Sequence, residues 1–169
     1  MSAEKLGTRY AKSLFMEATN KAALDTVFAD LNLLQNTLNS SRDLRAVFNS
    51  PVIKSYKKEA ITKQIFSGKI NPITENFLQV VIQQGRDAFL KDIIVAFTKM
   101  YNEKNGISEV NVTTAIPLDA ASEQKIADFI KATSDNPNVK INKKVDAAIV
   151  GGFIVDLEVK FMTIPFDIN

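Results

Sequence analysis

The spacing of apolar residues changes at Asn105-Gly106, and this change limits the fold more than any other feature of the sequence. Before it, apolar residues recur every three to four positions, as on one face of an α-helix. After it, Val110, Val112 and Thr114 alternate with polar or smaller residues, which is the pattern of a β-strand. The 169 residues therefore predict a helical domain over 1–105 and a small α+β domain over 106–169.

The first domain is expected to be a six-helix bundle, so that the fold class is mainly α. Ser41 is expected to cap the third helix, and Asn71-Pro72 to open the fifth, because proline suits the first turn of a helix. Ser50-Pro51 and Ser67-Gly68 are expected to break the helical pattern. The expected helices cover about 2–19, 22–38, 41–48, 54–66, 73–84 and 87–105.

The second domain is expected to contain strands over 107–116, 139–145 and 148–155, and a helix over 122–133. Gly151-Gly152 lies inside the last of these strands. The pair lacks the Gly-x-Gly-x-x-Gly or Gly-Lys-Ser/Thr setting of a nucleotide-binding loop. A bulge, or close packing of a neighbour against bare backbone, is the favoured interpretation.

The sequence contains no histidine and no cysteine. Cys or Ser-His nucleophile systems and Cys/His zinc sites are therefore excluded, together with the commonest general base near neutral pH. We expect no catalysis, although an enzyme that uses carboxylates or lysine stays open as an alternative. The acids that we expect at helix ends or on polar surfaces, without forming a catalytic pair, include Asp25, Asp30, Asp87 and Asp92.

Positive charge is concentrated in the first domain, with 15 Lys+Arg against 10 Asp+Glu over 1–105 and 6 against 9 over 106–169. The densest basic stretch runs from Lys54 to Lys63, and Lys54, Lys57 and Lys58 share a helix face. A solvated surface is favoured over a phosphate-binding patch. A basic helical domain that binds nucleic acid, or another adaptor protein, is the alternative.

The sequence predicts no membrane-spanning helix, because its longest uncharged apolar run near the end, 147–155, is far shorter than the ~20 residues that a bilayer requires. The N-terminal residues lack the apolar core of a signal peptide. A soluble, intracellular protein is therefore expected.

Two helices combine bulky apolar residues with alanines, which allow close approach or leave a groove for a partner helix. For any one of these residues, a position in the core is favoured over a position at an interface. The residues concerned are Tyr10, Ala11, Leu14, Phe15 and Ala18 in the first helix, and Phe77, Leu78, Val81 and Ile82 in the fifth.

Several segments together resemble one family, the delta subunit of F-type ATP synthase, equivalent to the mitochondrial oligomycin-sensitivity-conferring protein (OSCP). Residues 9–15 (RYAKSLF) resemble its opening element, residues 50–53 (SPVI) its proline turn, and residues 114–118 (TAIPL) the start of its second domain. The most specific match is the C-terminal signature, which includes Val145, Asp146, Gly151 and Gly152. From Asp156 the chain departs from the family pattern, and Pro165 would interrupt the closing helix, so we expect an atypical end.

The resemblance implies a non-catalytic stator subunit without a cofactor, peripheral to the cytoplasmic face of a bacterial inner membrane and not inserted in it. In the family, the N-terminal bundle receives the N-terminal helix of an alpha subunit, and the second domain holds the b subunits of the peripheral stalk. The resemblance thus implies that proton-driven rotation is coupled to ATP synthesis, and that no nucleic acid is bound. The nine residues named above in the first and fifth helices become the candidates for the alpha-subunit groove.

Overall fold

The computed structural model describes residues 3–114, 120–133, 138–145 and 153–157. Contacts divide the chain into two compact units, Met1–Tyr101 and Asn102–Asn169. Within the second unit, the Asn102 amide donates a hydrogen bond of 2.9 Å to Glu109 Oε1. This contact ties the last turns of a helix to the first strand, so the second unit begins slightly before the Asn105-Gly106 change of period.

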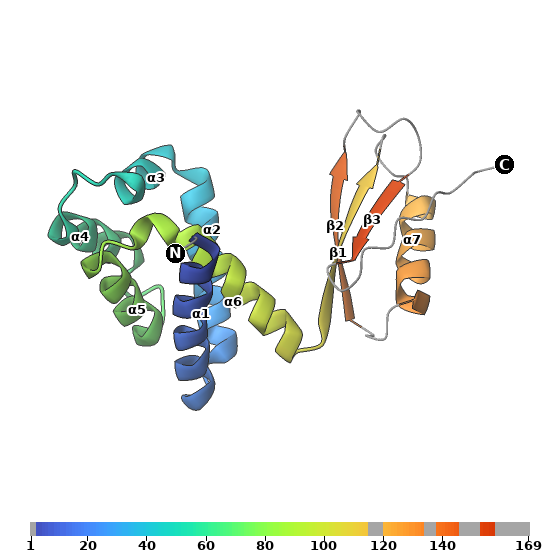
Figure 1. Cartoon of the computed structure of the whole chain (residues 1–169), viewed down its shortest axis with the longest axis horizontal. Helices are drawn as coiled ribbons and strands as arrows, with labels where there is room; N and C mark the ends of the chain where they lie inside the picture. The colour runs from blue at the N-terminus through green and yellow to red at the C-terminus, as the bar shows by residue number, and fades with distance from the viewer. Residues whose placement is uncertain (1–2, 115–119, 134–137, 146–152, 158–169) are drawn as a thin grey trace. The chain divides into compact units, whose positions relative to one another are not determined.

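Helices α1 to α6, which Figure 1 labels, and a short 3-10 helix, η1, precede the first strand, and only the last turn of α6 extends past the first unit. Their bounds are α1 Ala3–Asn20, α2 Leu24–Ser40, α3 Arg42–Asn49, α4 Ser55–Phe66, α5 Pro72–Gln83, η1 Asp87–Phe89 and α6 Leu90–Lys104. The predicted cap at Ser41 and the predicted helix start at Asn71-Pro72 are confirmed, and Asn71 also caps its helix. Ser41 Oγ accepts from Leu44 N at 3.2 Å at the start of α3, and Asn71 Oδ1 accepts from Ile73 N at 3.0 Å at the start of α5.

One apolar core joins all six α-helices of the first unit. Burial of its side chains removes apolar surface from water, at about 25 cal/mol per Å², and is the main favourable term for this unit. Gly7 lies where α1 crosses α6, and a Cβ atom there would come within 2.9 Å of the Asp92 backbone carbon. The core comprises Ala11, Leu14, Ala18, Val27, Leu31, Leu34, Leu44, Phe48, Phe66, Ile73, Leu78, Val81, Ile82, Leu90, Ile93, Ile94 and Phe97.

The second unit contains a three-stranded sheet in the order β2-β1-β3, with the helix α7 beside it (Figure 1). Strand β1 pairs in parallel with β2 and antiparallel with β3. The parallel pair requires a crossover connection, and α7 supplies its helix. The bounds are β1 Ile107–Thr114, α7 Ala120–Thr133, β2 Asn138–Val145 and β3 Phe153–Leu157.

The alternation of side chains along β1 gives the sheet two different faces. Val110, Val112 and Thr114 are buried, as is Ile126 of α7. The intervening positions form a polar face, where Asn142 donates to Asn111 Oδ1 at 3.3 Å. The prediction of a mainly helical chain with a small α+β part is confirmed. The last strand runs to Leu157 instead of ending at Val155, and Gly151-Gly152 lies outside the described residues.

The C-terminal end of α6 is held against α2 by two aromatic rings. Phe28 and Tyr101 stack with centroids 3.8 Å apart and an interplanar angle of 3°. The Tyr101 hydroxyl donates a 2.7 Å hydrogen bond to Asp25 Oδ1. This hydrogen bond, then burial and the negative charge of Asp25, raise the pKa of Tyr101 above its ordinary value of 10.0.

This raised pKa predicts a pH-dependent contribution of Tyr101 to stability. Because the folded state favours the protonated phenol, the contribution is fully present below the unfolded pKa of about 10 and is lost as pH rises through the higher folded pKa. The ultraviolet titration of the wild type minus that of Tyr101→Phe is expected to have its midpoint above 10.0. Asp25→Asn is expected to lower that midpoint, and an unchanged midpoint would contradict the assigned cause.

Candidate functional site

The candidate groove residues of α1 and α5 fall into two groups. Six of the nine have relative exposures of 0–1% and belong to the core: Ala11, Leu14, Ala18, Leu78, Val81 and Ile82. The other three, Tyr10, Phe15 and Phe77, are partly exposed and border that core. The buried group can set the spacing and rigidity of the two helices, whereas direct contact with a partner falls to side chains that reach the surface.

Tyr10 connects the outer sides of α1 and α5. Its hydroxyl donates a 2.7 Å hydrogen bond to Gln84 Oε1, and its ring meets the Phe77 ring edge to face, with centroids 6.5 Å apart. The Arg9 guanidinium carbon lies 5.9 Å from the centroid of the Tyr10 ring, in the range of a cation–π interaction. We name the residues Tyr10, Phe77, Val80 and Gln84 the α1–α5 face.

Val80 and Gln84 were missed as candidate residues in the sequence. Val80 is 45% exposed, and it follows Phe77 by three positions and precedes Gln84 by four. That spacing places Phe77 and Val80 on one side of α5 and continues to Gln84, the residue that caps its C-terminal end, and it was the signal available in the sequence. Phe15, in contrast, packs against Phe97 of α6, with centroids 5.6 Å apart, so the structure does not bring it to the α1–α5 face.

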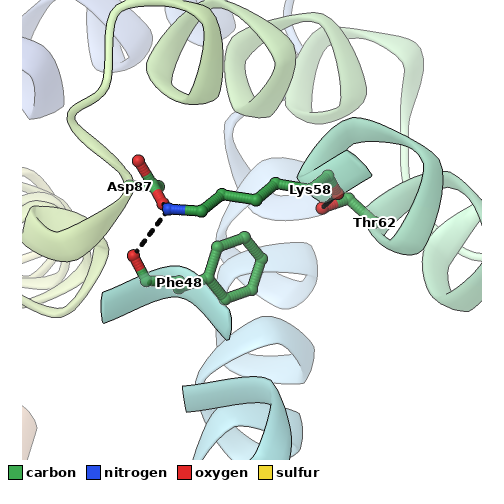
Figure 2. Close-up of polar contacts among 4 residues, drawn as sticks. All are labelled: Phe48, Lys58, Thr62 and Asp87. Atoms are coloured by element: carbon green, nitrogen blue, oxygen red, sulfur yellow. Dashed lines mark hydrogen bonds and ion pairs between the residues drawn. The ribbon is translucent and has the colours of Figure 1, made fainter. Parts of the chain in front are cut away.

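A buried ion pair connects α4 to η1. Lys58 Nζ contacts Asp87 Oδ2 and donates a 3.1 Å hydrogen bond to the carbonyl of Phe48 at the end of α3 (Figure 2). The lysine and aspartate side chains are only 6% and 5% exposed. The Thr62 hydroxyl donates to the Lys58 carbonyl at 2.8 Å. Since both charges are satisfied inside the unit, the pair acts as a structural cross-link between three segments.

This geometry corrects the prediction that Lys58 belongs to a solvated basic face. Lys58, Thr62 and Phe66 recur every four residues along α4 and point into the unit. Asp30 and Asp87 were expected on polar faces at helix ends or surfaces. Asp87 does open η1, but both side chains are buried, so the expected polar face was wrong for them. Asp30 accepts hydrogen bonds from Thr74 Oγ1 at 2.7 Å and from the Asn71 backbone nitrogen at 2.8 Å, and so ties α2 to the start of α5.

In the second unit, the structure describes only part of the C-terminal signature. Val145 ends β2 and is 54% exposed, while Asp146, Gly151 and Gly152 lie outside the described residues. Among the described residues, no cluster of three or more Asp, Glu, His or Cys side chains could hold a metal ion. No helix in the described ranges is long and apolar enough to cross a bilayer.

The order of these elements and their residues can be compared with known proteins. Residues 6–163 match the profile of the family described as "ATP synthase delta (OSCP) subunit". The chain belongs to this family. The match continues past Asp156, so it includes part of the tail that departs from the C-terminal signature.

Similar proteins of the delta (OSCP) family occur in several bacteria. The ATP synthase subunit delta of Flavobacterium psychrophilum is 36% identical over 155 residues, which cover 92% of this chain and 86% of that protein. The corresponding subunit of Cytophaga hutchinsonii is 33% identical, with coverage of 94% and 86%. A chain in the cryo-EM structure of the Toxoplasma gondii mitochondrial ATP synthase hexamer shares the fold, with a TM-score of 0.81 at 22% identity and coverage of 96% and 91%.

Membership of the delta (OSCP) family confirms the predicted function of a stator subunit of ATP synthase. The chain is a structural subunit and not an enzyme. The nucleic-acid alternative is not favoured, and burial of Lys58 weakens it further because the basic row that suggested it is interrupted.

Proposed function

We propose that this stator subunit links the catalytic head of the ATP synthase to its peripheral stalk, so that proton-driven rotation is coupled to ATP synthesis. In this proposal, residues 1–105 form one helical bundle that receives the N-terminal helix of an alpha subunit. Residues 106–169 contact the b subunits of the stalk. Membership of the family supports the overall role, and the α1–α5 face supports the alpha-subunit contact.

We assign the alpha-subunit contact to the α1–α5 face because this face combines partly exposed apolar groups with a fixed polar group. Tyr10, Phe77 and Val80 offer surface that an amphipathic helix can cover. The hydrogen bond between Tyr10 and Gln84 holds the two helices together beneath such a partner. The buried alanines Ala11 and Ala18 bring α1 close to the core, so this surface is rigid before binding and little ordering entropy is lost.

We further propose that the subunit is peripheral at the cytoplasmic face of a bacterial inner membrane. The similar bacterial subunits support this placement. A stator must resist the torque of the rotor, and long-lived contacts made by each of the two units meet that demand. The b-subunit contact is assigned to the second unit by the family resemblance alone, because the signature residues lie largely outside the described ranges.

If the α1–α5 face binds the alpha subunit, substitutions at two exposed valines are expected to differ in their effect on the binding affinity. Val80→Glu is expected to weaken binding of a synthetic alpha-subunit N-terminal helix by about tenfold or more, because a charge replaces an apolar contact. Val95→Glu is the matched control, since Val95 is 55% exposed on α6. Isothermal titration of the full chain measures both affinities. Equal affinities, or no binding by the wild type at high micromolar peptide, would refute the assigned surface.

A further inference from the structure

The most exposed large apolar side chains among the described residues lie at the start of α4. Val52 is 82% exposed in the turn before the helix, and Tyr56 is 67% exposed in its first turn. Ala60 follows Tyr56 by four positions on the same side of the helix and is also exposed. None of the three belongs to the apolar core of the first unit or packs against it.

Lysines surround these apolar groups. Lys54, Lys57 and Lys63 are exposed and form no ion pair within the described residues. Glu59, the only acidic residue of α4, is half-buried. Over residues 42–66 there are 6 Lys+Arg against 2 Asp+Glu, although the whole chain has a net charge of only +2. Three of these cationic side chains, Lys54, Lys57 and Lys63, are exposed in or next to α4, close in sequence to the exposed apolar groups.

We propose that this surface, the α4 face of Val52, Lys54, Tyr56, Lys57, Ala60 and Lys63, docks an acidic amphipathic segment of another protein in the ATP synthase complex. Exposed tyrosine provides a large anchor at little cost in conformational entropy, and the lysines around it select negative charge. The positive end of the α4 helix dipole lies at the same end of the helix, so an anionic partner offsets both the lysines and the dipole.

Nucleic acid fits this surface less well. A single aromatic side chain is no stacking platform, and the basic row is interrupted where Lys58 turns inward to Asp87. The α4 face shares no residue with the α1–α5 face. Docking at the α4 face requires that the chain is part of the ATP synthase complex, but it does not require the proposed alpha-subunit contact.

Photocrosslinking in the purified, assembled ATP synthase tests the proposal. In one variant a benzoylphenylalanine replaces Tyr56. In a second variant, the matched control, it replaces Leu33, an exposed apolar residue of α2. We expect position 56 to crosslink to a protein segment that carries apolar residues and several Asp or Glu. Crosslinks to lipid, to nucleic acid or to a basic segment, or a yield no higher than at position 33, would overturn the proposal.

Charge reversal separates electrostatic docking from simple proximity. In the crosslinking chain, Lys57→Glu with Lys63→Glu is expected to lower the yield per assembled subunit by about tenfold, since like charges then face each other. Lys99→Glu, an equivalent change at an exposed residue of α6, is expected to leave the yield unchanged. Equal crosslinking yields in the chain with unchanged lysines, the double variant and the Lys99→Glu variant would overturn the proposal. Failure of the alpha-peptide titration, in contrast, would leave these results intact and would refute only the α1–α5 assignment.

Discussion

Replacing Asp87 with alanine is expected to lower the free energy of unfolding of the first unit by about 3–5 kcal/mol. The substitution leaves the Lys58 ammonium buried with only the Phe48 carbonyl as a partner. An unpaired buried charge loses its hydration without regaining an equivalent interaction, so the cost exceeds that of one lost hydrogen bond. Urea unfolding followed by circular dichroism measures the difference.

Two controls distinguish a buried ion pair from a general sensitivity to charge removal. Glu17→Ala breaks the exposed ion pair with Lys21 and is expected to cost less than about 1 kcal/mol. The double variant Lys58→Met/Asp87→Leu removes both buried charges together and is expected to recover most of the lost stability. If Asp87→Ala cost no more than Glu17→Ala, the two side chains could not be buried as a pair.

Leu14→Asp is expected to unfold the first unit. Leu14 is 1% exposed in the core, and the substitution both removes an apolar side chain and places a carboxylate among apolar neighbours. Loss of the leucine alone costs about 2–5 kcal/mol, and the buried carboxylate adds several more, against a total stability of about 5–15 kcal/mol. Far-ultraviolet circular dichroism of the full chain should show a large loss of helix.

Ser13→Asp is the matched control for Leu14→Asp, because Ser13 is the exposed preceding residue of the same helix. It is expected to change the free energy of unfolding by no more than about 0.5 kcal/mol. The pair of variants also tests the groove assignment. A Leu14→Asp chain that kept its thermal midpoint but lost affinity for the alpha-subunit helix would place Leu14 at the interface instead of in the core.

The candidate site was only partly predictable from the sequence. Periodicity identified α1 and α5 as helices with apolar stripes, but one stripe can contain both core and surface residues. Ala11 and Phe77 were equal candidates in the sequence, yet Ala11 is buried and Phe77 borders the surface beside Tyr10. Residue spacing shows which side chains share one side of a helix, but the boundary between core and surface on that side depends on where the neighbouring helices lie.

The helical and strand regions, two helix starts and the family could be determined from the sequence alone, because they depend on local backbone preferences and on the order of motifs. The change of period at Gly106 separated helices from strands. The cap at Ser41 and the helix start at Asn71-Pro72 were placed correctly, and the ordered motifs identified the family. Only the tertiary structure determined which charged side chains are buried and with which residues they pair. Lys58 and Asp87 are 29 positions apart, and their pairing inside the unit depends on α4 and η1 meeting in space. A short-range pattern reports backbone preference, whereas burial of a charge is decided by its distant partner.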